Sequence, residues 1–135
     1  MITQATEAVS RPRKVERLVI EECLVGPEVS FFVMRDGQKP VGMGAFKLFE
    51  DGHAEIKSMH VLHEVRGRGL SRRMLDHLVA EARTAGIRKL SLETGSQAMF
   101  APARGLYLKA GFVECAPFAD YSLDPNSVFM TRDLA

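Results

Sequence analysis

The feature that most constrains this chain is a glycine-rich basic turn at residues 66–71, which lies between an apolar strand and an amphipathic helix. Glycine lets the main chain approach a ligand closely. A helix that begins here also offers unpaired N–H groups and the positive end of its dipole. The turn therefore suits a phosphate-bearing ligand, although the same pattern also occurs as a solvated turn before a helix. It consists of Arg66, Gly67, Arg68, Gly69, Leu70 and Ser71.

Two familiar phosphate-binding motifs do not account for this turn. The Walker pattern requires Gly, four residues and then Gly-Lys-Ser/Thr, and this order is absent. The dinucleotide pattern requires a third small residue at the position of Arg72. If the turn binds a phosphate, it belongs to another class of site.

Length and composition limit what the rest of the chain can be. A chain of 135 residues predicts one domain, residues 1–135, and its polar first twelve residues are expected to be flexible. A net charge of +1 argues against general attraction to nucleic acid or to an anionic membrane. There is no apolar run of membrane-spanning length and no signal-peptide core. Cys23 and Cys115 form neither a metal-ligand spacing nor a disulfide framework, so we expect a reducing cytoplasm and no metal.

The first half of the chain predicts one helix and three strands. Residues 13–24 carry apolar side chains at helical spacing, with charges between them. Apolar runs at 29–35 and 40–49 flank an Asp-Gly pair, which is a strong hairpin signal. Residues 54–61 alternate imperfectly, so we expect a strand with a bulge near Ser58.

The helix after the basic turn should pack on the sheet through one face and end at Gly86. The next strand is expected at residues 87–93. A strand, a helix and a strand in this order form a βαβ unit, so these two strands should be parallel. The expected buried face consists of Leu70, Met74, Leu75, Leu78, Val79 and Ala82.

The last third of the chain adds a helix at 102–110 that begins with Pro102, a short strand at 112–115 and a final strand at 127–134. The predicted fold class is therefore α/β, with a mixed, mostly antiparallel sheet that contains one parallel pair.

This order of elements, together with two motifs, resembles the GNAT superfamily of acetyl-CoA-dependent N-acetyltransferases. The superfamily's pyrophosphate loop reads Gln/Arg-x-x-Gly-x-Gly/Ala, and residues 66–71 follow it with Ser71 at the last position. Its second motif is Tyr, three residues and then Gly-Phe, which is present from Tyr107 to Phe112. The surrounding sequence is similar to a bacterial subgroup with no assigned acceptor. Phe100 stands where many members carry Asn.

The resemblance implies a GNAT-like twisted sheet with helices on both faces and a shortened N-terminal region. Members usually have a strand and two helices before the hairpin, whereas 28 residues precede Val29 here, enough for about one helix and a tail. The missing elements usually form one wall of the acceptor site. The site is then either open or completed by a second subunit, as in a homodimer.

The function implied by the resemblance is direct transfer of an acetyl group from acetyl-CoA to a primary amine of a small molecule or peptide. The basic turn would hold the pyrophosphate. The strand end before it would pair with the pantetheine arm, and the N–H of His60 or Val61 would polarise the thioester carbonyl. The implied cofactor-binding strand residues are Met59, His60 and Val61.

Three side chains are candidates for proton transfer. Neutralising a lysine-like amine at pH 7 costs about 4.6 kcal/mol, so a carboxylate base is expected. By resemblance to the family's histone-modifying members Glu55 is the first candidate, or else a strand residue paired with Lys57. Glu93 is the second, or else it fixes the following turn or pairs with Arg104. Tyr107 is the candidate acid for the leaving thiolate, or else a core aromatic residue.

Further residues and functions remain open at this level. The residues expected on the acceptor side are Arg104, Tyr121, Asp124 and Ser127. One alternative function is an acyl-CoA-binding regulatory module without turnover. A nucleic-acid binder using the arginines of the turn and helix is the other, and the small net charge argues against it.

Overall fold

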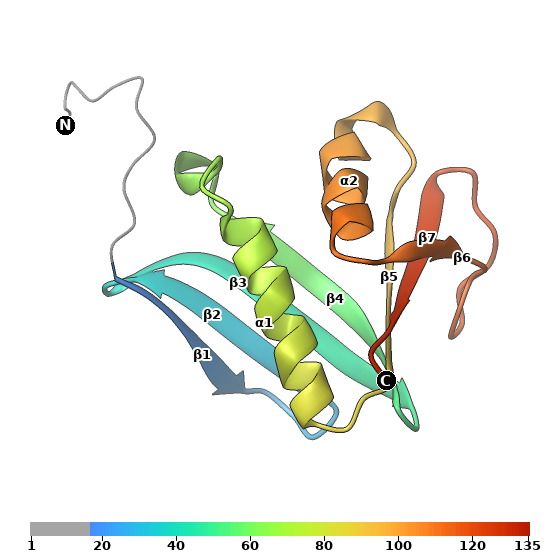
Figure 1. Ribbon diagram of the computed structural model, residues 1–135, viewed down its shortest axis with the longest axis horizontal. Helices are drawn as coiled ribbons and strands as arrows, with labels where there is room; N and C mark the ends of the chain where they lie inside the picture. The colour runs from blue at the N-terminus through green and yellow to red at the C-terminus, as the bar shows by residue number, and fades with distance from the viewer. Residues whose placement is uncertain (1–16) are drawn as a thin grey trace.

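The structure is a computed structural model that describes residues 17–135, which form one seven-stranded sheet and two α-helices (Figure 1). Short 3₁₀ helices, η1 (His63–Val65) and η2 (Ala98–Phe100), precede α1 and α2. In chain order the strands and α-helices are β1 (Leu18–Leu24), β2 (Val29–Asp36), β3 (Lys39–Glu50), β4 (His53–Val61), α1 (Leu70–Thr84), β5 (Lys89–Gly95), α2 (Ala101–Lys109), β6 (Val113–Cys115) and β7 (Ser127–Asp133).

The strand order across the sheet is β1-β2-β3-β4-β5-β7-β6. Every neighbouring pair is antiparallel except β4 and β5, which are joined by the crossover through α1. The predicted mixed sheet with one parallel pair is confirmed. The strand predicted at 87–93 begins two residues later than expected, at Lys89.

The helix predicted at 13–24 is wrong for the part that the structure describes. Residues Leu18–Leu24 form the edge strand β1, which pairs with β2 from Leu18 opposite Asp36 to Leu24 opposite Ser30. Leu18 and Ile20 pack against the core while Val19 between them is exposed, which is the alternation of a strand. Residues 13–16, and the first twelve residues expected to be flexible, lie outside the described part.

A bulge in β4 changes which side chains this strand presents. Ala45 of β3 pairs with Ser58, whereas the next residue, Phe46, pairs with Ile56. Lys57 is therefore the extra residue, which confirms the irregularity predicted near Ser58. A bulge bends its strand and turns a side chain in a new direction.

Helix α1 covers β3 and β4 through its apolar face (Figure 1). All six residues expected on that face are buried. A Cβ at Gly44 of β3 would lie 2.9 Å from Met74, so the missing side chain allows the helix to lie close to the sheet. Leu75 and Leu78 are fully buried, and each such side chain contributes about 1.5–3 kcal/mol.

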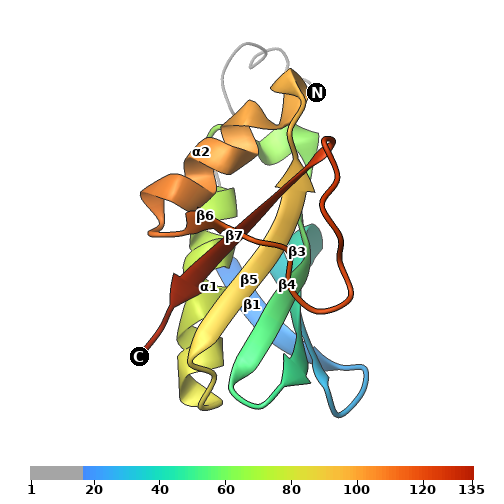
Figure 2. The ribbon, with the colours of Figure 1, turned by 90° about the vertical axis from the view of Figure 1, so that its right-hand side faces the viewer.

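Both helices of the described part lie on the same side of the sheet in Figure 2, and the loop before β7 lies on the other side. Residues 18–24, where a helix was predicted, form the edge strand β1 and add no helix to either face. The loop is attached by aromatic contacts: Phe118 lies 5.7 Å from Phe49 and 5.9 Å from Phe129, measured between ring centroids. None of the helices in residues 17–135 has the length and apolarity to cross a bilayer.

Candidate active site

The candidate site lies where β4 and β5 separate. The two strands pair only at their first residues, His53 to Glu55 with Lys89 to Ser91. Beyond this point they diverge, and α2 lies above the opening (Figure 1). Main-chain groups along the inner edges of diverging strands are no longer used by a partner strand. A parallel pair that opens in this way forms a cleft.

The glycine turn is placed at one mouth of this cleft. Gly67 and Gly69 have positive φ angles of 85° and 73°, and a Cβ at either would have no atom within 4 Å. Gly69 is the N-cap of α1, and no side chain caps the helix. Because the first N–H groups of a helix have no intrahelical partner, they remain available to a ligand. The Nε of Arg66 donates to the carbonyl of Val61 at 3.2 Å and ties the turn to the end of β4.

A pocket of about 550 Å³ connects this turn to α2. We call it the helix-side pocket. Residues from β4, the turn and the α2 region line it: Met59, His60, Val61, Arg66, Ser71, Met99, Phe100, Pro102, Ala103, Leu106 and Tyr107. Five of the residues expected to bind the cofactor therefore lie together in this pocket, namely Met59, His60, Val61, Arg66 and Ser71.

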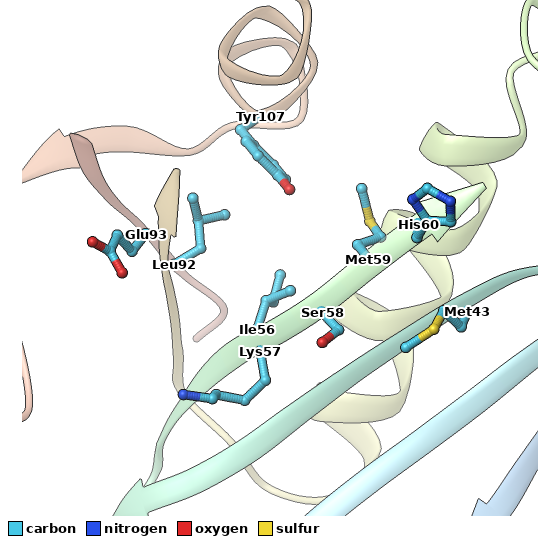
Figure 3. Close-up of a pocket in the computed structure, with 9 residues that line it drawn as sticks. All are labelled: Met43, Ile56, Lys57, Ser58, Met59, His60, Leu92, Glu93 and Tyr107. Atoms are coloured by element: carbon cyan, nitrogen blue, oxygen red, sulfur yellow. The ribbon is translucent and has the colours of Figure 1, made fainter. Parts of the chain in front are cut away.

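A second pocket of about 440 Å³ adjoins the first (Figure 3). We call it the sheet-side pocket. It shares Met59, His60 and Tyr107 with the helix-side pocket, so the two meet between β4 and α2. Its lining consists of Met43, Ile56, Lys57, Ser58, Met59, His60, Leu92, Glu93 and Tyr107.

Tyr107 stands at the junction of the two pockets. The side chain is 9% exposed, and its hydroxyl points into the gap between the strands (Figure 3). Phe112 contacts the ring edge-on at 5.9 Å between centroids. Burial raises the pKa of Tyr107 above 10, because it disfavours the phenolate. The group therefore holds a proton at neutral pH in a position where it can donate it.

Glu93 is the carboxylate that lines the sheet-side pocket. It is an exposed residue of β5, and Ser127 of β7 donates from its hydroxyl to Oε2 at 2.5 Å. One carboxylate oxygen is thus fixed by Ser127, and this hydrogen bond leaves the other oxygen, Oε1, unused. The pairing of Glu93 with Arg104 that the sequence allowed is not observed.

Glu55 has a different environment. It is only 7% exposed and is absent from the lining of both pockets. The Tyr121 hydroxyl donates to its Oε2 at 2.5 Å, and the Nζ of Lys57 lies 3.6 Å from its Oε1. The hydrogen bond to Glu55 raises the pKa of Tyr121. The pairing with Lys57 that the sequence left open is therefore present.

The four residues expected on the acceptor side do not line the sheet-side pocket. Arg104 donates to the carbonyls of Gly95 and Gln97 at 2.6 and 3.0 Å and shapes the loop after β5. Asp124 accepts from the amide of Asn126 at 2.8 Å within a turn. Tyr121 and Ser127 instead hold Glu55 and Glu93.

Sequence reasoning missed several lining residues. Lys57 reaches the sheet-side pocket from the β4 bulge, and an irregular alternation was the available signal. Ala103 and Leu106 line the helix-side pocket together with Tyr107, which was predicted. Their spacing of three and four residues places them on one face of α2, so the helical period could have identified this wall.

Comparisons with known proteins identify the family of the chain. Residues 2–112 match the model of a family described as acetyltransferase (GNAT) family. The chain is 45% identical over 126 residues to the N-acetyltransferase YsnE of Bacillus subtilis, covering 93% of this chain and 83% of that protein. It is 38% identical over 125 residues to the IAA acetyltransferase of Azospirillum brasilense, covering 91% and 80%.

Solved structures share the fold. An acetyltransferase from Elizabethkingia anophelis with acetyl-CoA bound has a TM-score of 0.74 at 13% identity, and covers 87% of this chain and 99% of its own. A Bacillus subtilis acetyltransferase in complex with CoA also has a TM-score of 0.74, at 15% identity, with the same coverage of 87% and 99%. At these identities the likeness is one of fold.

Proposed function

The chain belongs to the acetyltransferase (GNAT) family, and on that premise we propose that it transfers the acetyl group of acetyl-CoA directly to a primary amine of a small molecule or peptide. The observation that carries the proposal is the meeting of two pockets at Met59, His60 and Tyr107. One pocket leads to the open amides of the turn, and the other leads to the carboxylate of Glu93. A donor in one pocket and an acceptor in the other can thus meet at one point.

The turn and the end of β4 would bind the donor. Amides from Gly67 to Ser71 would donate to the diphosphate of acetyl-CoA, since they are uncapped and sterically open. The main-chain N–H of His60 or Val61 would donate to the thioester carbonyl. Charge that develops on this oxygen during attack is then stabilised by a fixed donor.

Glu93 is our candidate for the base. A lysine-like amine is protonated at pH 7, and removing its proton costs about 4.6 kcal/mol. Glu93 lines the pocket and has one carboxylate oxygen outside its bond to Ser127, so it can take this proton directly or through water. Glu55 is less suited to the role, because Tyr121 and Lys57 engage its two oxygens and it lines neither pocket.

Tyr107 is our candidate for the acid. As the amine nitrogen bonds to the carbonyl carbon, the nitrogen releases its extra proton to water, the carbon–sulfur bond breaks and the sulfur leaves as a thiolate. The phenol can then give its proton to the sulfur, and because burial raises the pKa of Tyr107 it carries that proton throughout the neutral range. We further propose a reducing cytoplasm as the site of the reaction, since Cys23 and Cys115 are free thiols.

The proposal is tested by a thermal-shift titration with acetyl-CoA, followed by an amine panel in which released thiol is measured. A hundredfold excess of ligand over Kd should stabilise the protein by about 2.7 kcal/mol. We expect this stabilisation, and thiol release with at least one amine. Stabilisation without thiol release would favour the regulatory-module alternative, and no stabilisation would contradict both functions.

A further inference from the structure

The sheet-side pocket carries two opposite charges on its two walls. Glu93 is carried by β5 and Lys57 by β4, and both line this pocket (Figure 3). Lys57 is the one Lys or Arg among the nine residues that line this pocket. The same pocket is lined by the apolar side chains of Ile56, Met59 and Leu92. A ligand that fills this pocket therefore meets a cationic group and an anionic group at different points.

The ammonium of Lys57 keeps hydrogen-bonding capacity for a ligand. Its described neighbours are Oε1 of Glu55 at 3.6 Å and the hydroxyl of Tyr121 at 3.5 Å. Both distances exceed the 2.7–2.9 Å of a charge-assisted hydrogen bond. The strong bond in this cluster is the one from Tyr121 to the other oxygen of Glu55, at 2.5 Å. With 45% of its side chain exposed, Lys57 can turn its donors toward the pocket.

The charge of Lys57 is permanent at neutral pH. Partial burial lowers the pKa of Lys57, but Glu55 and Tyr121 outweigh that effect and the pKa is raised above 10.5. Arg104, the cation expected on this side, is committed to the carbonyls of Gly95 and Gln97. Lys57 is therefore the cation that can recognise an anion in the sheet-side pocket.

We propose that the acceptor is a small amine that also bears a carboxylate, bound with its nitrogen toward Glu93 and its carboxylate on Lys57. This inference rests on the proposed function, because it names the acceptor class for the same site. A plain amine or a polyamine would offer no carboxylate to the ammonium of Lys57 and would add further positive charge beside it. Opposite charges in the ligand match opposite charges in the pocket, and a mismatch disfavours the wrong ligand.

The first test compares acceptors of matched shape. Leucine is paired with 3-methylbutylamine, and glycine, 3-aminopropanoate and 4-aminobutanoate vary the distance between the two charges. Binding is measured by thermal shift with CoA present, which needs no turnover, and acetyl transfer is measured by thiol release. We expect at least one amino acid to bind and react at least tenfold better than its decarboxylated partner.

The second test uses variants of the recognising lysine. We expect Lys57→Met to lower kcat/KM for the preferred amino acid by about 10- to 100-fold, the effect of losing a hydrogen bond to a charged group. The kcat/KM of the same variant for the decarboxylated amine should change less than about threefold. Lys57→Arg should restore most of the selectivity. Lys109→Met makes the same chemical change on the exposed end of α2, outside both pockets, and should leave selectivity unchanged.

The outcomes separate the two proposals. Selective binding of amino acids without thiol release would support the acceptor class and contradict the enzymatic function. Thiol release with plain amines at rates equal to those of amino acids would support the function and overturn the acceptor class. Selectivity that is the same in wild type and Lys57→Met would also overturn the assignment of Lys57. The Lys57→Arg protein is the control that shows whether the position tolerates substitution.

Discussion

The two ends of the β4–β5 pair use their polar groups in opposite ways. At the paired end, His53 Nε2 lies 2.6 Å from the hydroxyl of Ser91, which lies 2.9 Å from the hydroxyl of Thr131. Thr131 in turn donates to the carbonyl of Leu90 at 3.1 Å. These contacts join β4, β5 and β7, and Ser91 is 1% exposed. At the diverging end, Arg66 and Ser71 of the turn, together with Tyr107 and Glu93, line pockets instead.

We therefore expect the paired end to govern the stability of the fold and the diverging end to govern activity. Buried polar groups that satisfy one another are costly to disturb, because each removal leaves a partner without a hydrogen bond. Groups that face a pocket contribute little to folding and are available to ligands. Substitutions at the paired end should therefore change the free energy of unfolding, whereas those at the diverging end should change binding and turnover.

The largest effect is expected at Gly69. We expect Gly69→Asp to abolish CoA binding, at least 100-fold in Kd, because it places a carboxylate against the diphosphate. Gly86 is the matched control, since it lies just past the other end of α1 with a φ angle of 82°, close to the 73° of Gly69, and also has open space at its Cβ. Both substitutions strain the backbone by about 1–2 kcal/mol. Calorimetry should find binding lost only in Gly69→Asp, and loss in both would show that strain is the cause.

The next effect concerns the base. We expect Glu93→Gln to lower kcat about 100-fold at pH 7, the scale of general base catalysis. The deficit should shrink as the pH approaches the pKa of the amine, because the acceptor then loses its own proton. Glu55→Gln is the comparison, with a loss below tenfold. A larger deficit in Glu55→Gln, measured over the same pH range, would move the role to Glu55.

Tyr107→Phe should lower kcat by about 10- to 100-fold, because the leaving thiolate loses its proton donor. The Kd for acetyl-CoA should change less than about threefold, since the ring and its packing are kept. Single-turnover kinetics and calorimetry separate the two quantities. A wild-type rate of the chemical step would remove Tyr107 from the mechanism.

At the paired end, Ser91→Ala should lower the free energy of unfolding by about 1–3 kcal/mol, the cost of leaving buried partners unsatisfied. Urea denaturation measures this change, and the KM for acetyl-CoA should be unaffected. Ser122→Ala, at an exposed position, is the control and should be neutral within about 0.5 kcal/mol. A change in KM comparable to the change in stability would mean that the two ends are not independent.

The smallest expected effect is a pH dependence at His53. Burial lowers the pKa of His53 below 6.5, with Glu50 opposing this shift and Lys89 adding to it. The unfolded chain therefore binds the proton more readily, and the stability from His53 is present above pH 6.5 and lost as the pH falls through its lower folded pKa. The urea midpoint should fall between pH 7.5 and 5.5 more in wild type than in His53→Asn. Equal shifts would exclude His53 as the source.

The same contrast explains what the sequence could predict. The turn at 66–71 binds through the main chain, and its glycines leave a signature in the sequence. The buried face of α1 follows a regular period, and all six of its residues were predicted. Strand β1 was mistaken for a helix because its stability comes from pairing with β2 rather than from its own short pattern.

The acceptor side was less predictable because its side chains meet over long sequence separations. Tyr121 bonds to Glu55 across 66 residues, and Ser127 bonds to Glu93 across 34. Residue type marked Glu55, Glu93, Tyr121 and Ser127 as functional candidates. It could not show which of them would line a pocket and which would hydrogen-bond to another candidate. The contacts from His53 to Ser91 and from Ser91 to Thr131 also join residues far apart in the sequence, so no local pattern predicts them.

The central claim is that the diverging end of the β4–β5 pair brings a thioester to Tyr107 while the turn holds its nucleotide. A crystal structure with CoA tests this most directly. The account predicts diphosphate oxygens at about 3 Å from the main-chain nitrogens of residues 67–71, and the sulfur between Met59 and Tyr107. Density for the nucleotide elsewhere, or turn amides directed into the protein, would contradict it.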